Sequence, residues 1–362
     1  MRILWIVGFL VIIGGYALLR AAGNDPKSLF SDIKDDEFVQ FFNSTAWFDA
    51  PAREWHVPVR GWIYEPEDST LRRAVFEKIL REKYALEVDE AAEANFARRL
   101  NLIIADNERA KSIVIDIAGR REVLPASEPN GHFGAVLVIP EEDMIEHASH
   151  GFLHYAAVTR PNDTREFAGA IRLVESSGLS IISDIDDTVK VSMVTDRKAL
   201  LDYAFLRDFQ AAPGMAEWYR EWVNDDVSLH FVSSSPWQLY APLKEFLDDH
   251  GFPWANLNLK LVRFRDETLF DLFKKGTETK PATIREILGR YPDRDFVLVG
   301  DSGEQDPEVY AGLLREYPQQ VKKAYIRNVT NETPDNERFA AVFDGIDADR
   351  WVLFDHPKEI AD

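Results

Sequence analysis

Two aspartates at the end of a short apolar run are the residues of this chain best suited to chemistry. Residues 180–183 include two adjacent isoleucines, and Asp184, Asp186 and Thr188 follow at every second position. In an extended backbone, residues two apart project to the same side, so Asp184 and Asp186 face the same space. Two carboxylates this close repel each other unless one is protonated or a cation lies between them. The spacing therefore favours a hard divalent cation such as Mg²⁺, which prefers oxygen ligands.

Further polar groups lie at comparable places later in the chain. Ser233 and Ser234 follow an apolar run, Lys280 precedes a proline at the start of an expected helix, and Asp301 and Asp306 follow residues 296–300. Phosphoryl transfer needs this inventory: a carboxylate nucleophile, an acid for the leaving oxygen, and hydroxyl and lysine contacts to phosphate. Each group also has a structural interpretation, since a serine can cap a helix, a lysine can be a surface residue, and an aspartate can form a turn.

The elements that must position these groups are strands alternating with helices. From about residue 176 onward, β-branched runs such as 227–232 and 295–300 alternate with helical segments, which is typical of a parallel sheet. Parallel strands carry their chemistry just beyond their carboxyl ends, where these polar groups fall. The pattern predicts an α/β domain over residues 176–362, with the candidate groups at one edge of its sheet.

Residues 53–175 show a different period. Apolar and polar residues alternate in short segments such as 55–64, 112–117 and 132–139, which favours a β-sandwich-like domain. A helical insertion is expected within it, because residues 71–84 carry an apolar stripe at helical spacing and residues 91–100 continue it. We interpret the stripe as packing on the sheet, with a membrane-binding face as the alternative.

The amino-terminal segment is apolar. Residues 3–19 contain no charge, and Ala21, Ala22 and Gly23 form a passable cleavage site, so residues 1–23 are expected to be a signal peptide or membrane anchor. Residues 24–52 are expected to be a polar tether with an acidic, solvated cluster. The protein is accordingly expected to be membrane-anchored or exported, with its catalytic domain outside the cytoplasmic membrane.

Composition limits the functions that the chain can have. Its 362 residues carry 42 Lys and Arg against 62 Asp and Glu, for a net charge of −20, which disfavours a nucleic-acid partner. The chain contains no cysteine, so disulfides, thiol catalysis and zinc–thiolate sites are excluded. An anionic substrate must therefore be held by local basic groups and a metal ion.

The longer strings around the polar groups resemble a known family. Residues 183–190, 232–240 and 299–308 are similar to the actin-patch type of phosphatidate phosphatase catalytic domain, in the lipin-like, Mg²⁺-using branch of the haloacid dehalogenase superfamily. The resemblance is strong over about residues 150–330. It implies a haloacid-dehalogenase-like Rossmannoid sheet domain, preceded here by the β-sandwich domain.

The resemblance also implies a role for each motif residue. Asp184 would be the nucleophile and Asp186 the general acid and base, with Lys280 as a third catalytic group. The phosphoryl group would be held by Thr188, Ser233, Ser234 and Lys280. Mg²⁺ would be bound by Asp184, the Asp186 carbonyl and Asp301, with Asp306 ordering its waters. Lys190 and Arg327 are candidate anion contacts.

The function expected from these residues is Mg²⁺-dependent hydrolysis of phosphatidate to diacylglycerol and phosphate, through an aspartyl-phosphate, at a membrane surface. One alternative keeps the mechanism and replaces the lipid with a soluble phosphomonoester. The other alternative is a non-catalytic surface-binding protein in which the acidic loops form a structural cation site.

Overall fold

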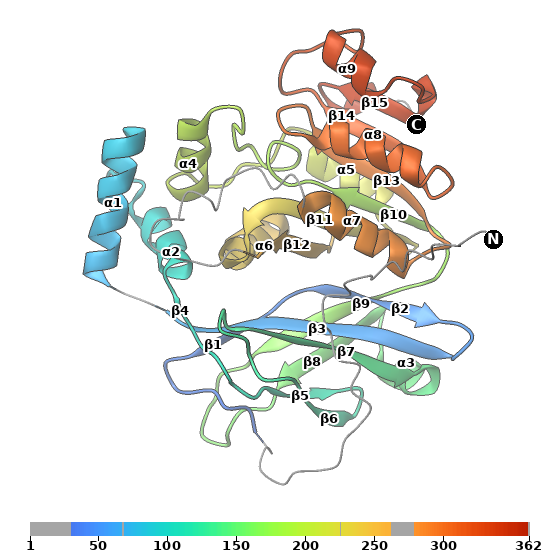
Figure 1. Cartoon of the computed structure of the whole chain (residues 1–362). Helices are drawn as coiled ribbons and strands as arrows, with labels where there is room; N and C mark the ends of the chain where they lie inside the picture. Colours follow the sequence, from blue (N-terminus) through green and yellow to red (C-terminus); the bar gives the residue numbers. More distant parts are fainter. Residues whose placement is uncertain (1–29, 67–68, 225, 262–278, 361–362) are drawn as a thin grey trace, which may run out of the picture.

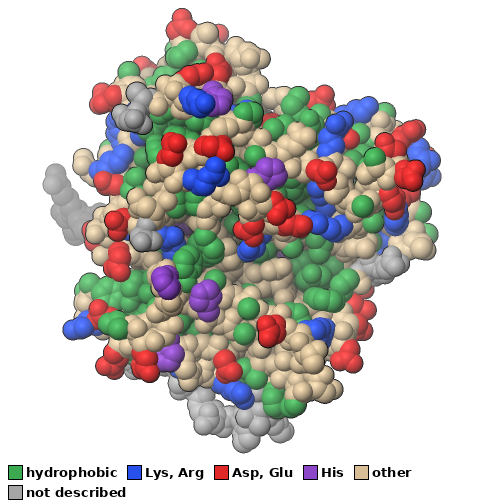
Figure 2. Space-filling view, turned by 180° about the vertical axis from the view of Figure 1, so that it is seen from behind, with side chains coloured by type: hydrophobic (Ala, Val, Ile, Leu, Met, Phe, Trp, Pro, Cys, Tyr) green, Lys and Arg blue, Asp and Glu red, His purple; other side chains and the backbone are tan. Residues whose placement is uncertain are grey.

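The computed structural model describes residues 30–66, 69–224, 226–261 and 279–360. These residues form two sheets with helices around them (Figure 1). Asp and Glu side chains are spread over both halves of the molecule in the view of Figure 2, as the net charge of −20 requires. The mixed α/β class predicted from the sequence is confirmed.

The second half of the chain builds a six-stranded sheet in the order β12-β11-β10-β13-β14-β15, and all its pairs are parallel. Its strands are β10 (Leu179–Ser183), β11 (Val227–Pro236), β12 (Asn256–Lys260), β13 (Asp295–Asp301), β14 (Val321–Arg327) and β15 (Trp351–Phe354). Strand β10 lies between β11 and β13, so the chain proceeds to one side of β10 and then to the other. This is the topological switch point at which open parallel sheets bind their ligands.

Helices cover both faces of this sheet. They are α4 (Arg197–Phe205), α5 (Met215–Trp222), α6 (Tyr240–Asp249), α7 (Thr279–Arg290), α8 (Asp306–Glu316) and α9 (Glu337–Val342). Alternate residues of β10 enter different cores: Ile181 packs with α5 and α6, and Ile182 packs with α7 and α8. Because both faces of the strand are buried, β10 reads as a continuous apolar run rather than an alternating one.

The first half of the chain forms a nine-stranded, mainly antiparallel sheet with one core. Its elements are β1 (Phe38–Phe41), β2 (Ser44–Asp49), β3 (Glu54–Glu65), β4 (Asp106–Asn107), β5 (Val114–Ile117), β6 (Arg120–Val123), β7 (His132–Pro140), β8 (Phe152–Ala157), β9 (Ala168–Val174) and the short helix α3 (Glu141–His147). The long strand β3 pairs with β1, β2, β4 and β7. A sandwich of two separate sheets is not confirmed, because the described strands are hydrogen-bonded as one sheet.

Part of the segment interpreted as a polar tether is a piece of this sheet. Residues 38–41 and 44–49 form β1 and β2, and β2 pairs with β9 in parallel. The apolar residues Val39 and Phe41 are buried in the core, although they follow directly on the acidic cluster. The predicted boundary between residues 175 and 176 lies in the connection between β9 and β10. The domain boundaries themselves stay predictions.

The expected helical insertion is α1 (Thr70–Tyr84) and α2 (Glu93–Ile103), and it packs largely against the second half of the chain. The Phe76 ring of α1 lies 5.2 Å from the Phe205 ring of α4, and Arg99 of α2 donates a hydrogen bond to the Ala204 carbonyl at 3.2 Å. The apolar stripe therefore buries Phe76 and Leu80 in a core shared by both halves of the chain. It leaves Leu71 and Val75 exposed.

The localisation expected from the sequence, a membrane-anchored or exported protein, is corrected here. Among the residues that the structure describes, no helix is long and apolar enough to cross a membrane. The apolar run at residues 3–19, on which that expectation rested, lies outside the described residues.

Glu37, one residue of the acidic cluster, forms a buried ion pair and is not a solvated charge. Glu37 is fully buried, and its Oε1 lies 2.6 Å from Nζ of Lys111, itself only 7% exposed. Burial alone would raise the pKa of Glu37, but Lys111 and Lys34 outweigh burial and lower that pKa below its ordinary value of 4.5. The pair therefore stabilises the fold while Glu37 is ionised.

Lys111→Met is expected to lower the free energy of unfolding by about 3 kcal/mol at pH 7, because it leaves a buried carboxylate without its main partner. The pair contributes fully above pH 4.5 and is lost as the pH falls through the lowered pKa of folded Glu37. The difference between wild type and variant should therefore shrink below pH 4.5, as measured by urea denaturation. Lys244→Met, at an exposed lysine, is the control; an equal loss in both variants would contradict the prediction.

Candidate active site

Asp184 lies at the carboxyl end of the central strand β10. Its backbone N–H donates to the Val299 carbonyl of β13 at 2.9 Å, so the neighbouring strand fixes its position. The side chain is 1% exposed, and burial raises the pKa of Asp184 well above its ordinary value, against the opposing effect of Lys280. A carboxyl group in this position is ionised only where positive charge is supplied beside it.

Lys280, from the first turn of α7, supplies part of that charge. Its Nζ lies 2.9 Å from Oδ1 of Asp184 and 2.5 Å from Oδ1 of Asp306. Burial alone would lower the pKa of Lys280, but these two carboxylates raise it well above the ordinary value. Lys280 is therefore a buried, charged ammonium group that joins residues 122 positions apart along the chain.

Asp301 and Asp306 complete a cluster of three buried carboxylates. One oxygen from each of Asp184, Asp301 and Asp306 lies within 4.8 Å of the others. Oδ1 of Asp301 accepts hydrogen bonds from the N–H groups of Gly303 and Glu304, whereas its buried Oδ2 has no hydrogen-bond partner. Burial raises the pKa of Asp301 well above its ordinary value, and repulsion from Asp306 and Asp184 adds to the effect.

Glycine at position 300 lets Asp306 approach the strand end. A Cβ atom on Gly300 would lie 2.3 Å from Oδ2 of Asp306, closer than non-bonded atoms can come. That same oxygen accepts a 3.3 Å hydrogen bond from the backbone N–H of Asp301. The close approach of the strand to this carboxylate therefore requires the absence of a side chain at residue 300.

Asp186 lies beside this cluster with different partners. Its Oδ1 lies 2.8 Å from Nζ of Lys190, and its Oδ2 accepts hydrogen bonds from Ser233 at 3.1 Å and Ser235 at 2.7 Å. Burial alone would raise the pKa of Asp186, but Lys190 and the hydroxyl donors outweigh burial and lower it to about 2. Two aspartates two residues apart thus have opposite electrostatic environments, with the pKa of Asp184 raised and the pKa of Asp186 lowered.

The loop after Asp186 is shaped by Asp187. This residue has a φ of 56°, a left-handed conformation that non-glycine residues rarely adopt. Its carboxylate accepts hydrogen bonds from the backbone N–H groups of Ser192, Met193 and Val194 at 2.6–2.9 Å. The turn therefore brings Lys190 and Ser192 back onto Asp186, where both contact Oδ1.

The remaining predicted residues lie around the same point. Thr188 is fully buried, with its hydroxyl 3.4 Å from Oδ2 of Asp184, so its observed partner is the aspartate. Ser233 lies at the end of β11 and contacts Asp186. Ser234 points to a small cavity of about 30 Å³ that Asp186 and Glu304 also line. The structure thus brings all the residues predicted from the sequence to one edge of the parallel sheet.

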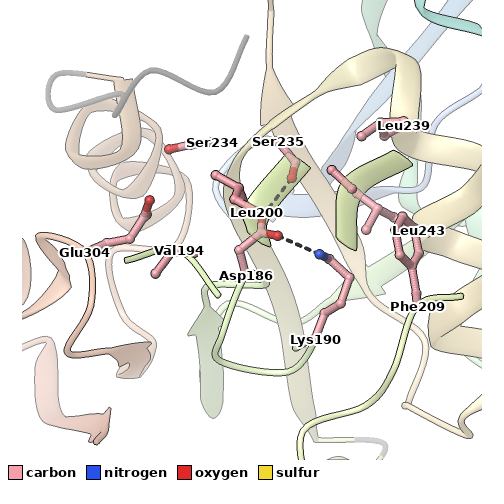
Figure 3. Close-up of a pocket in the computed structure, with 11 residues that line it drawn as sticks. Asp186, Lys190, Val194, Leu200, Phe209, Ser234, Ser235, Leu239, Leu243 and Glu304 are labelled. Carbon is pink, nitrogen blue, oxygen red and sulfur yellow. Dashed lines mark hydrogen bonds and ion pairs between the residues drawn. The ribbon is translucent and has the colours of Figure 1, made fainter. Parts of the chain in front are cut away.

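The cavity beside Asp186 has a polar wall and an apolar wall. Figure 3 shows Lys190 and Ser235 directed at Asp186, and Leu239, Leu243 and Phe209 form an apolar wall on the same side of Asp186. Leu200 and Ala204 of α4 extend the apolar wall. The cavity next to Asp186 is therefore lined by both polar groups and hydrocarbon.

Sequence reasoning did not assign roles to Asp187, Ser192, Ser235 or Glu304. Ser235 lies two residues after Ser233 in a strand, so the same-side rule used for Asp184 and Asp186 could have found it. Lys190 was considered only as an anion contact, although its position four residues after Asp186 permits the ion pair observed. The role of Asp187 depends on a rare backbone conformation, for which the sequence holds no clear signal.

Comparison with known proteins matches this part of the chain. Residues 179–328 match the family model described as "Phosphatidate phosphatase APP1, catalytic domain". Among curated proteins, the chain is 34% identical over 167 residues to phosphatidate phosphatase APP1 of Saccharomyces cerevisiae, covering 45% of this chain and 28% of that protein. It is 29% identical over 171 residues to an uncharacterised protein of Schizosaccharomyces pombe, covering 46% of this chain and 28% of that protein. The chain thus spans less than a third of the length of these two relatives.

Proposed function

We propose that the protein hydrolyses phosphatidate to diacylglycerol and phosphate, because residues 179–328 match the model of the phosphatidate phosphatase APP1 catalytic domain. The resemblance inferred from the motif strings is confirmed for this part of the chain. The observation that carries the proposal is the convergence of Asp184, Asp186, Ser233, Lys280 and Asp301 at the switch point of the parallel sheet. The same order of motifs supports placing the domain in the haloacid dehalogenase superfamily.

The proposed reaction has two displacements at phosphorus. In the first, an Asp184 oxygen bonds to phosphorus, the bond to the glycerol oxygen breaks, and protonated Asp186 gives its proton to that oxygen. In the second, water attacks the aspartyl-phosphate, its proton passes to Asp186, and the bond between Asp184 and phosphorus breaks. Phosphate leaves, and both aspartates return to their starting forms.

The surroundings of Asp186 keep it ionised, as the second displacement requires. With a pKa lowered to about 2 it is a carboxylate, the form that accepts a proton from water. A phosphate dianion bound beside it repels that negative charge and raises its pKa, which favours the protonated form needed in the first displacement. In this proposal Ser233, Ser234 and Lys280 would hold the phosphate oxygens.

Magnesium is the cofactor that the residues favour. Three crowded carboxylates and the partnerless Oδ2 of Asp301 form a donor set that hard cations bind, and no sulfur or imidazole group accompanies them. Asp184, Asp301 and the Asp186 carbonyl would hold Mg²⁺, and Asp306 would order its waters. When bound, the ion neutralises negative charge on the phosphate oxygens.

The preference for a lipid substrate rests on the family match, and hydrocarbon also lies beside Asp186. Since Asp186 protonates the leaving oxygen, the leaving group lies on its side of the site, against Leu239, Leu243 and Phe209. The cavity is small, about 30 Å³, so only the atoms next to the leaving oxygen would reach it.

The test measures phosphate released by the purified full chain from phosphatidate in detergent micelles and from a panel of soluble phosphomonoesters, with Mg²⁺ or with chelator. Mg²⁺-dependent release that favours phosphatidate is the expected result. Release from soluble esters alone would support the assigned active site but contradict a lipid substrate. No release from any substrate by the folded protein would leave a non-catalytic binding protein with a structural cation site.

Arg338 of α9, outside the matched range, is expected to position the loop between the metal-binding aspartates. It donates hydrogen bonds to the carbonyls of Ser302 at 2.5 Å and Glu304 at 2.6 Å, and it pairs with Glu308 at 2.8 Å. Arg338→Ala should raise the Mg²⁺ concentration needed for half-maximal activity about tenfold or more, as loss of a group behind a metal ligand commonly does.

The matched control for this prediction is Arg315→Ala. Arg315 also donates to two backbone carbonyls, those of Val342 and Asp344, but both lie away from the loop. The measurement is a Mg²⁺ titration of phosphate release by wild type and both variants. Equal Mg²⁺ requirements in all three proteins would contradict the role given to Arg338.

A further inference from the structure

The most exposed apolar helix face in the described chain lies outside the catalytic domain, on α1. Leu71 is 74% exposed and Val75 is 53% exposed, and they lie one helical turn apart with Ile79 following at the same spacing. A groove of about 500 Å³ runs between this stripe and the end of α2, and Phe76, Ile103 and Ile104 contribute to its apolar lining. A continuous apolar surface of this kind marks a contact site.

The charge on α1 is opposite to that of the whole protein. The helix has five Lys and Arg against two Glu, a net charge of +3, whereas the chain carries −20. Arg72, which pairs with Asp106 at 3.1 Å, and Lys78, 3.9 Å from Glu82, each lie three residues from Val75, so basic side chains border the apolar stripe on both sides. An apolar helix face bordered by cations complements an anionic lipid surface, which offers hydrocarbon below a layer of negative headgroups.

This surface is connected to the active site through packing. Phe76, on the inner side of α1, contacts Phe205 of α4, and Leu200 and Ala204 of α4 line the apolar wall beside Asp186. Arg197 of α4 also lies over the Tyr84 ring at the end of α1. Figure 1 shows α1, α2 and α4 together at one end of the molecule.

We propose that α1 is the surface by which the protein docks reversibly on an anionic phospholipid bilayer, with Leu71 and Val75 entering the headgroup layer. The inference rests on the proposed function, because it supplies the contact through which a bilayer-held substrate reaches the site. The Leu71–Val75–Ile79 stripe gives the apolar contact, and the basic residues beside it select for negatively charged lipid. Neutral bilayers should bind more weakly and high salt should release the protein.

The absence of cysteine makes a site-specific test possible in the full chain. Val75→Cys is labelled with an environment-sensitive fluorophore and mixed with phosphatidylcholine vesicles, with and without phosphatidylglycerol, in the presence of chelator. Ile145→Cys is the matched control, since Ile145 is 75% exposed and lies on α3, far along the chain from α1. The expected result is a blue shift and increased emission at residue 75 on the anionic vesicles only, with no change at residue 145.

Two results would overturn the docking surface. One is no response at residue 75, or an equal response at residue 145. The other is a response that appears without vesicles as protein concentration rises, which would assign the stripe to contact between two copies of the chain. Because chelator and a non-substrate lipid are used, the test does not depend on turnover. If residue 75 responds but the protein does not hydrolyse phosphatidate, the docking surface is supported and the proposed activity is contradicted.

A kinetic comparison gives a second, independent measurement. Leu71→Ser combined with Val75→Ser should raise KM for phosphatidate in vesicles about tenfold while leaving kcat/KM for a soluble phosphomonoester unchanged. Ile145→Ser combined with Val123→Ser removes similar exposed apolar area and should change neither value. An unchanged KM on vesicles in the α1 variant would contradict the proposal.

Discussion

Asp184→Asn is expected to reduce phosphate release by a factor on the order of 10⁴ or more, because an amide cannot form the bond to phosphorus. The protein should remain folded. The change removes one of three crowded, buried carboxylates, and Lys280 retains its contact with Asp306. The thermal midpoint measured without metal should therefore be equal to that of the wild type or higher.

The control for this variant lies at the other end of the same sheet. Asp295→Asn changes an aspartate at the first residue of β13, which pairs with Lys322 at the surface. Its activity should equal that of the wild type. Substantial turnover by Asp184→Asn, after contaminating wild-type protein is excluded, would remove the covalent step from the mechanism.

Lys280→Ala is the second change with a large expected effect, and it should reduce both activity and stability. It removes the ammonium group that lies within 2.9 Å of two carboxylates, so kcat/KM should fall about 10²–10³-fold through the loss of a preorganised charge. The free energy of unfolding in chelator should fall by about 3 kcal/mol, because the buried carboxylates lose their only close basic partner among the described residues.

Added Mg²⁺ should recover part of this lost stability, since a divalent cation neutralises the same carboxylates. The comparison is Lys244→Ala, at an exposed lysine paired with Asp248, which should change neither activity nor stability. Steady-state kinetics and urea denaturation, each with and without Mg²⁺, measure both effects. A variant of Lys280 with wild-type kinetics would remove this residue from the site.

The parallel sheet and the convergence of its polar residues could be predicted from the sequence because both depend on short-range patterns. Buried parallel strands appear as apolar runs, and the residues after them meet at one edge whatever the details of the helices. Asp184, Ser233 and Asp301 were placed together by this argument, and Lys280 was added from its position at a helix start and from the family resemblance. The structure brings them together as expected, and their roles in catalysis stay predictions.

The features that the sequence did not reveal depend on tertiary contacts. Glu37 lies among exposed acidic residues, and only the approach of Lys111, 74 positions later, makes it a buried ion pair. The stripe on α1 was expected to pack on the sheet of its own domain, but Phe76 packs on α4 while Leu71 and Val75 face outward. A helical period identifies an apolar face, but not the partner that covers it.

One buried arginine makes several hydrogen bonds at the junction between the two sheets. Arg294, 2% exposed just before β13, donates hydrogen bonds to the carbonyls of Glu175, Ser177, Leu179 and Asp226 and to the Ser180 hydroxyl. Nearby, Asn43 of the first half donates its backbone N–H to the Tyr240 hydroxyl at 2.7 Å and its amide group to the Ala255 carbonyl at 3.0 Å.

The segment that carries the family match therefore depends on contacts with the part of the chain that precedes it. Cutting the chain at residue 179 would leave the Arg294 guanidinium without two of its acceptors, and would strip the hydrocarbon cover of Phe42 from Trp237 and Tyr240. A variant that starts at residue 179 should therefore be less stable to urea than the full chain.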